Sequence, residues 1–292
     1  MPHPLSSRRW LCLFALLAPL PAFADADVSS RWESQVQRIS AHTQTPARAA
    51  AIGERLDTLG LSWKQEGFEQ DGKTGTNLVA DLGGPADAPL LLIGAHYDQV
   101  DVGHGATDNA SGVAAVLELA TALKANPLQH HRVQLVFWDL EEHGLLGSRA
   151  WVATPEREQP ALYVNFDVFG WGDTLWMMSP EADTLLVAAL RAASKYQKLD
   201  FEPGDKYPPT DHLAFLKAGW SAVSFSLVGR DEIGPILEIF GGGKPAEVPK
   251  VMQVIHSPRD TAAELDGRQV DDALRVVEAG LRAWDQAGTA RH

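Results

Sequence analysis

A strand of the buried type that runs directly into metal-ligand side chains is the feature that most constrains this chain. Residues 89–112 read PLLLIGAHYDQVDVGHGATDNASG: an apolar run leads into His96 and Asp98, and a glycine-rich loop then leads to Asp108. Active sites of α/β folds lie at the carboxyl ends of strands, and two residues two positions apart on a strand share a face. A metal-binding histidine is commonly held by a carboxylate at its second ring nitrogen. The stretch therefore suits a metal site, with a plain strand and polar loop as the alternative.

Strand-type and helix-type patterns alternate through the middle of the chain. We expect strands at 61–69, 77–82, 90–96, 132–140, 161–168, 174–178 and 221–228, and helices at 28–41, 47–59, 111–124, 145–152, 181–196, 211–217 and 267–287. Such alternation favours a mostly parallel sheet covered on both faces, and the hairpin at Asp71-Gly72 adds an antiparallel edge. We predict an α/β fold: a single three-layer α/β/α domain with a mostly parallel, mixed sheet. Residues 241–249 read as a loop within it.

The amino terminus has the form of a secretory signal. Arg8 and Arg9 precede an apolar run over 10–18, and Ala22-Phe23-Ala24 forms a small-x-small cleavage pattern. The run is too short for a permanent membrane span. We predict a signal peptide at 1–24 and a mature domain at 25–292, periplasmic or secreted. The general secretory route is expected for export, with the twin-arginine route, suggested by Arg8-Arg9, as the alternative. A buried N-terminal helix is the alternative.

Cysteine content and charge exclude several classes of protein. Cys12, the one cysteine of the sequence, lies inside the predicted signal, so the mature chain would have neither a disulfide nor a thiol nucleophile. Without residues 1–24 the chain carries 23 basic and 38 acidic side chains, a net charge of −15. This balance argues against nucleic acid and against anionic membrane surfaces as partners. We expect a monomer with no membrane anchor after cleavage.

Four further candidates for ligands lie near the ends of predicted strands or in loops. Glu141 and Glu142 follow one apolar strand, Asp167 ends another, and His256 lies in the loop VIHSPRD. A parallel sheet would bring the strand-end residues to one edge. Carboxylate and imidazole ligands together suit zinc, and two histidines with three carboxylates serve two metals if one carboxylate bridges. Of the glutamate pair, one could bind metal while the other acts as a base; an exposed acidic pair is the alternative.

Five motifs together resemble a known family. GAHYD, GATDNASG, EEHGLLGS, NFD and HSPRD occur in this order within about residues 75–262. They are similar to those of the zinc aminopeptidases of the bacterial leucyl aminopeptidase, aminopeptidase Y and glutamate carboxypeptidase type. The resemblance implies two zinc ions per chain, with these roles: His96 and Asp167 bind the first zinc, Glu142 and His256 bind the second, Asp108 bridges both, Asp98 orients His96, and Glu141 is the general acid/base. It also implies a cis peptide bond between Asp108 and Asn109.

A sixth segment, YPPTDHLAF, gives a third catalytic candidate. Members of the family carry a Ser-Asp-His segment, and in the bacterial leucyl aminopeptidases an upstream tyrosine stabilises the transition-state oxygen. Thr210, Asp211 and His212 match the segment, and Tyr207 falls at the tyrosine position. The cysteines that flank this tyrosine in the relatives are absent, so a packing or surface role for Tyr207 remains open.

The resemblance implies an exopeptidase, most simply an aminopeptidase acting on peptides with a free N-terminus. Glutaminyl cyclases share the fold but use one zinc and lack the first histidine ligand, whereas His96 is present here. A carboxypeptidase would need a basic pocket, for which Lys206 and Arg230 are only isolated candidates. A non-catalytic binding module would have lost ligands that this chain keeps.

Several residues near the motifs have no assigned role. The histidines and aspartates in question are His104, His143, Asp211, His212 and Asp260. The apolar group Phe169, Trp171, Trp176, Met177 and Met178 reads as core more readily than as a pocket for the substrate side chain.

Overall fold

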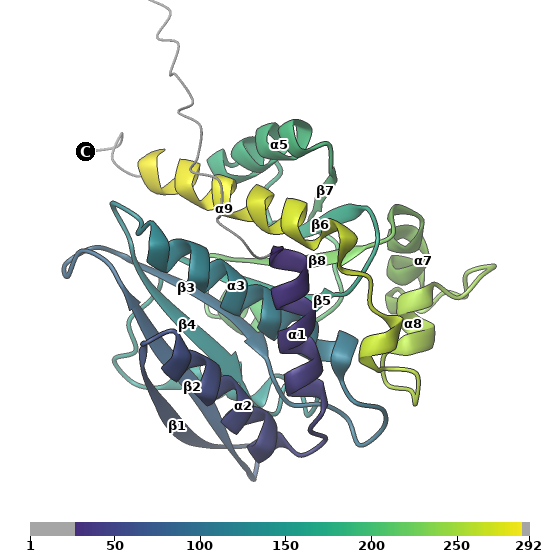
Figure 1. Cartoon of the computed structure of the whole chain (residues 1–292), viewed down its shortest axis with the longest axis horizontal. Coiled ribbons are helices and arrows are strands. Elements are labelled where there is room, and N and C mark those ends of the chain that lie inside the picture. The colour runs from purple at the N-terminus through teal and green to yellow at the C-terminus, as the bar shows by residue number, and fades with distance from the viewer. Residues whose placement is uncertain (1–26, 288–292) are drawn as a thin grey trace, which may run out of the picture.

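The computed structural model describes residues 27–287, whose strands form one mixed sheet (Figure 1). The strands are β1 (Ser62–Gln70), β2 (Lys73–Gly83), β3 (Leu90–His96), β4 (Arg132–Trp138), β5 (Leu162–Phe169), β6 (Thr174–Met178), β7 (Asp200–Gly204) and β8 (Ala222–Val228). Their order in the sheet is β1-β2-β4-β3-β5-β8-β6-β7. The signal predicted at 1–24 lies outside the described residues.

The four central strands are parallel, and the strand that adjoins them on each side is antiparallel to them. β4, β3, β5 and β8 run in one direction, while β2 joins β4 and β6 joins β8 in antiparallel pairs. Every residue of β3 and of β8 is buried, as expected for parallel strands covered on both faces. The predicted fold class, including the antiparallel hairpin edge, is confirmed.

Helices cover both faces of the sheet, and Figure 1 looks onto one of these helix layers. They are α1 (Val28–Ser40), α2 (Thr45–Thr58), α3 (Ser111–Ala125), α4 (Leu146–Ala153), α5 (Leu185–Gln197), α6 (His212–Lys217), α7 (Arg230–Phe240), α8 (Lys250–Val254) and α9 (Val270–Ala287), with a single π-type turn at Ala106–Ala110. The main apolar core joins α1, α2, α3, α5 and α9 to one face. Trp151 of α4 and Phe215 of α6 pack on the other face, which completes three layers.

Three elements were not predicted from the sequence. Strand β7 is an edge strand that pairs only with β6, and its sequence DFEPG contains a proline and a glycine, which suit an edge but give no strand pattern. Helix α7 contains Pro235, which breaks the usual helix signal. Helix α8 is a single short turn of five residues. Residues 241–249, between α7 and α8, form the predicted loop.

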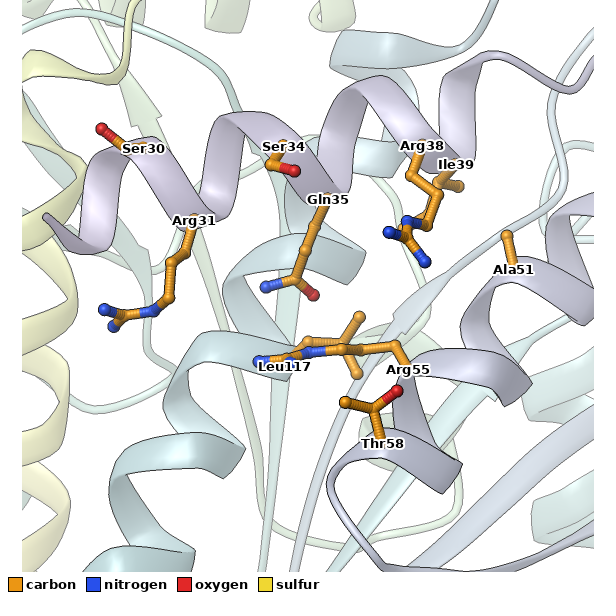
Figure 2. A pocket seen from close by; sticks show the side chains of 10 residues that line it. All are labelled: Ser30, Arg31, Ser34, Gln35, Arg38, Ile39, Ala51, Arg55, Thr58 and Leu117. Carbon is orange, nitrogen blue, oxygen red and sulfur yellow. The ribbon is translucent and has the colours of Figure 1, made fainter. Parts of the chain in front are cut away.

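A surface pocket of about 290 Å³ lies between α1, α2 and α3 (Figure 2). Three arginines line it, and each has an anionic partner; Arg38 lies 3.8 Å from Glu54. Arg31 lies 2.8 Å from the buried carboxylate of Glu118, and Arg55 lies 3.8 Å from it. The pocket is thus largely a structural junction of three helices. Among residues 27–287, none of the helices combines the length and the apolar character that a membrane span requires.

Candidate metal centre and active site

Five ligand-type side chains converge at the carboxyl edge of the central parallel strands. His96 ends β3, Asp167 lies near the end of β5, and Glu142 follows β4. Asp108 lies in the π-type turn before α3, and His256 follows α8. Together they make two groups of three, His96 with Asp108 and Asp167, and Asp108 with Glu142 and His256; in each group the donor atoms lie within 4.8 Å of one another. The structure therefore brings together all five predicted ligands, with Asp108 in both groups.

The two oxygens of Asp108 face two different histidines. Its Oδ1 lies 3.1 Å from His96 Nε2, and its Oδ2 lies 3.2 Å from His256 Nε2. On the outer sides, Asp167 Oδ1 lies 3.5 Å from His96 Nε2 and Glu142 Oε2 lies 3.0 Å from His256 Nε2. One carboxylate between two such groups has the geometry of a bridging ligand.

The donor set fits zinc. Each group offers one imidazole nitrogen and two carboxylates, which is a catalytic type of zinc site with room for further ligands. The buried Oδ1 of Asp167 has no well-formed hydrogen bond within residues 27–287, although it points into the cluster. A buried carboxylate oxygen without a donor is costly unless a cation takes that place.

In the metal-free protein the two histidines take the place of the cation. Hydrogen bonds that His256 donates to Asp108 and Glu142 raise its pKa to about 10. Burial opposes the charge of His96, but Glu141 and the hydrogen-bonded carboxylates outweigh it and raise the pKa well above its usual value. Burial likewise opposes the charge of Asp108, yet the two histidines hold its pKa well below the usual range. The carboxylates of the cluster thus stabilise positive charge at its centre.

Asp98 supports this cluster from behind. Its Oδ1 faces His96 Nδ1 at 3.4 Å, longer than a well-formed hydrogen bond. The same carboxylate accepts hydrogen bonds from the main-chain N–H of Glu141 at 3.0 Å and of Glu142 at 3.2 Å. Asp98 is therefore in contact with one candidate ligand and with the loop that carries another.

Glu141 lies beside the ligands in a half-buried position. Burial is the main reason that its pKa is raised well above the usual value, and the charges of Asp211, Asp167 and Asp108 add to this while His96 opposes it. Asp211 is fully buried with a pKa raised to about 7 by burial. A carboxyl group with a raised pKa next to a metal cluster suits proton transfer at neutral pH.

Tyr207 reaches the cluster through strand β8. Its hydroxyl is hydrogen-bonded to Ser226 Oγ, which in turn donates to the main-chain oxygen of Asp167. The ring packs 4.5 Å from Trp176 and 5.7 Å from His212. Tyr207 thus lies beside the candidate ligand Asp167, held by aromatic packing and a hydrogen bond to Ser226.

Backbone geometry is unusual where the ligands are presented. Leu140, Val168 and His256 have φ values of 58°, 56° and 54°, a left-handed conformation that is uncommon for any residue with a side chain and rarer still for a β-branched one. Each is a candidate ligand or lies within two residues of one. Strained residues of this kind cluster at functional sites. The peptide bond between Asp108 and Asn109 is cis, as the resemblance implied.

Two of the residues without an assigned role, Asp260 and His104, contact main-chain groups. Asp260 accepts hydrogen bonds from the main-chain N–H of Thr107 at 2.6 Å and of Asp108 at 3.2 Å. It therefore fixes the turn that presents Asp108. The ring of His104 contacts the main-chain oxygen of Ser40 at 3.1 Å.

The other open residues behave as structural or surface groups. His143 is exposed, and burial lowers the pKa of His212 to about 4. The apolar group that follows Asp167 is buried, as expected for core: Phe169, Trp171, Trp176, Met177 and Met178. Sequence reasoning missed Arg48, which contacts the site loops and reads in the sequence only as one polar position of a helix.

The protein-family model for "Peptidase family M28" matches residues 77–280. Leucine aminopeptidase 2 of Trichophyton rubrum is 34% identical over 195 residues, which cover 60% of this chain and 39% of that protein. The chain spans between a fifth and two fifths of the length of the curated relatives it matches.

Two solved structures share the fold. A zinc aminopeptidase from Bacillus subtilis gives a TM-score of 0.58 at 23% identity, covering 72% of this chain and 50% of that one. Glutaminyl cyclase of Porphyromonas gingivalis gives a TM-score of 0.68 at 20% identity, covering 89% of this chain and 99% of that one. At these identities the likeness concerns the fold. The family match covers most of the chain and includes all five candidate ligands, so the chain belongs to peptidase family M28.

Proposed function

We propose that this protein is a two-zinc aminopeptidase that hydrolyses the N-terminal peptide bond of its substrates. The observation that carries the proposal is the pair of three-donor groups that share Asp108. His96 and Asp167 would hold one zinc, Glu142 and His256 the other, and Asp108 both. Zinc ions bound at such a site polarise a substrate carbonyl and lower the pKa of water.

The remaining steps are assigned to side chains of this chain. Glu141, half-buried beside the ligands, takes a proton from the attacking water and delivers it to the leaving amine. The Tyr207 hydroxyl, whose proton goes to Ser226 Oγ in this structure, would turn from Ser226 to donate to the developing oxyanion. Asp98 keeps His96 and the loop of Glu141 in register. The free amino group of the substrate would lie near the two zinc ions.

Release of a chromophore from aminoacyl-p-nitroanilides tests this proposal. The zinc-loaded protein should turn over at least one such substrate, should bind two zinc ions per chain, and should lose activity with a chelator and regain it with zinc. No turnover of any aminoacyl-p-nitroanilide or dipeptide by protein that carries two zinc ions would refute the aminopeptidase assignment.

A glutaminyl cyclase-like acyl transfer is the second candidate, favoured by one observation. This chain covers almost the whole length of the Porphyromonas gingivalis cyclase. Against it, His96 completes the first three-donor group. One zinc per chain, together with cyclisation of N-terminal glutaminyl peptides, would favour the cyclase. A carboxypeptidase is less well supported, because the candidate cation Arg230 is exposed and pairs with Glu202 at 3.0 Å.

We also propose export, with a signal at 1–24 and a monomeric mature domain at 25–292. The pattern of Arg8-Arg9, an apolar run and Ala22-Phe23-Ala24 supports it. Intact-mass measurement of the protein from its native compartment tests the cleavage. Its molecular mass in solution tests the monomeric state. A product that begins at Met1 would refute the cleavage.

A further inference from the structure

One arginine of helix α2, Arg48, is buried and points toward the candidate metal centre. Arg48 has no exposed surface and lies in the first turns of α2, before the segment 77–280 that matches the family. A fully buried arginine is rare unless its charge and its donors are satisfied. What satisfies Arg48 therefore indicates what it does.

All the hydrogen bonds of Arg48 go to two short segments that flank candidate ligands. Its Nε donates to the main-chain oxygen of Tyr97 at 2.6 Å, between His96 and Asp98. Its Nη1 and Nη2 donate to the main-chain oxygens of His104 at 2.9 Å and Gly105 at 3.0 Å. Gly105 immediately precedes the turn that presents Asp108. One rigid guanidinium thus spans the strand end of one ligand and the loop of the shared ligand.

The guanidinium of Arg48 binds neutral oxygen atoms rather than a carboxylate. No ion pair joins Arg48 to a carboxylate within residues 27–287; its partners are carbonyl oxygens and the side-chain oxygen of Gln99, at 3.3 Å. Burial lowers its pKa to about 10, while the charges of Asp98, Asp260, Asp108 and Glu142 act in the opposite direction. Arg48 is therefore cationic at neutral pH.

We propose that Arg48 is a positioning residue of the metal centre. Its guanidinium fixes the end of β3, which carries His96 and Asp98, against the loop that leads to Asp108, and its charge offsets that of the surrounding carboxylates. The inference rests on the proposed two-zinc function and deepens it. A lysine cannot replace this group, because a single ammonium on a flexible stem does not present the planar fork that reaches three carbonyl oxygens at once.

Helix α2 offers a matched control. Arg55 lies seven residues, or about two helical turns, after Arg48, so both side chains point inward from the same face. Arg55 contacts Thr121 at 3.3 Å and Glu118 at 3.8 Å, both on α3 and away from the ligands. Its loss removes a partly buried arginine from the same helix without touching the site loops.

The test compares Arg48→Met, Arg48→Lys and Arg55→Met with the wild-type protein. Zinc affinity is measured by competition with a chromophoric chelator. The visible spectrum of the cobalt(II)-substituted protein reports the ligand field, and steady-state kinetics on an aminoacyl-p-nitroanilide give kcat and KM. Arg48→Met should weaken zinc binding by about 10–100-fold, as loss of an outer support of a metal site does. It should also change the cobalt spectrum and lower kcat, with little change in KM.

The two other variants decide what the guanidinium supplies. Arg48→Lys, which keeps the charge and most of the stem, should also lose zinc affinity, though less; if Arg48→Met does not fold, this variant decides. Arg55→Met should keep the wild-type affinity and spectrum even if its melting temperature falls. Wild-type affinity and an unchanged spectrum in a folded Arg48 variant would overturn the inference. A wild-type chain that binds no zinc would overturn the proposed function, and the inference with it.

Discussion

The Asp98 carboxylate accepts a hydrogen bond from the main-chain N–H of Glu141 at 3.0 Å. Because Asp98 also faces His96 at 3.4 Å, it ties the strand end that carries a proposed ligand to the loop that carries the proposed base. A change at Asp98 should therefore affect both groups at once.

Asp98→Asn should lower kcat/KM by about 10–100-fold, because an amide nitrogen cannot accept from the Glu141 loop and no longer carries the charge that orients His96. Steady-state kinetics with zinc analysis checks this. Asp285→Asn is the matched control. Asp285 is equally buried, accepts from the main-chain N–H of Gln129 and His130, and faces His131 at 2.9 Å, but these residues precede β4 whereas Glu141 follows it. Equal activity in the two variants would contradict the role of Asp98.

Glu141→Gln should lower kcat by about 10²–10⁴-fold while zinc binding and the fold are kept, because an amide cannot accept the proton of water. Kinetics on an aminoacyl-p-nitroanilide, zinc content and melting temperature are the measurements. His143→Ala, an exposed position in the same loop, should leave kcat unchanged. Normal turnover by Glu141→Gln would disprove its assignment as the base.

Zinc binding at pH 7 should release protons. In the metal-free protein the pKa of His256 is about 10 and that of His96 is well above its usual value, so both are protonated, whereas zinc needs neutral imidazoles. Calorimetry in buffers of different ionisation enthalpy should show this release. Zinc affinity should increase as the pH rises toward 10. Affinity that is independent of pH would be incompatible with protonated histidines in the cluster.

The same pKa of His256 predicts how the metal-free protein responds to alkali. Because its folded value of about 10 lies above the ordinary 6.5, the ion pairs of His256 stabilise the fold fully below about pH 6.5. This contribution is lost as the pH rises through 10. Denaturant unfolding of the metal-free protein should give a lower free energy of unfolding at pH 10 than at pH 6. The difference between the two values should be smaller in His256→Gln.

Removal of zinc should lower the melting temperature. A ligand at about 1,000 times its Kd stabilises the folded state by about 4 kcal/mol. In a domain of this size, each kcal/mol of stability shifts the melting temperature by about 2–4 °C. Chelation should therefore lower the transition by about 8–16 °C, and added zinc should restore it. A melting temperature that does not respond to zinc would mean that the cluster does not bind it in the folded state.

Gly94→Ala should destabilise the fold by about 1–3 kcal/mol, because overpacking a close-packed interior forces its neighbours to move. A Cβ at Gly94 would lie 2.5 Å from the main-chain oxygen of Val136, on the adjacent strand β4. Gly67→Ala, on edge strand β1 with no atom within 4 Å of its Cβ, is the control and should be close to neutral. Denaturant unfolding of both variants gives the comparison, and equal stabilities would contradict the packing argument.

The ligand-bearing elements could be predicted because their signals are local. His96 ends an apolar run, and Asp167 and Glu142 each follow a mostly apolar one, so the parallel arrangement of the strands was enough to place all three at one edge. Asp108 and His256 lie in loops, and there the order of the motifs was needed. The central sheet followed from the alternation of patterns.

The remaining features depend on contacts that no local pattern encodes. Arg48 reads as a solvated position of an amphipathic helix until its carbonyl partners are seen. Asp260 supports a turn about 150 residues earlier in the chain, through Thr107 and Asp108. Strand β7 forms only because β6 offers it an edge, since its own composition favours a turn.

The five proposed ligands are spread from His96 to His256 and meet only through the finished sheet. A polypeptide that has not yet formed the sheet has no such meeting point. Under the proposed function, maturation would therefore run in one order, folding first and loading second. The ions available where the chain folds would then decide which metal it carries.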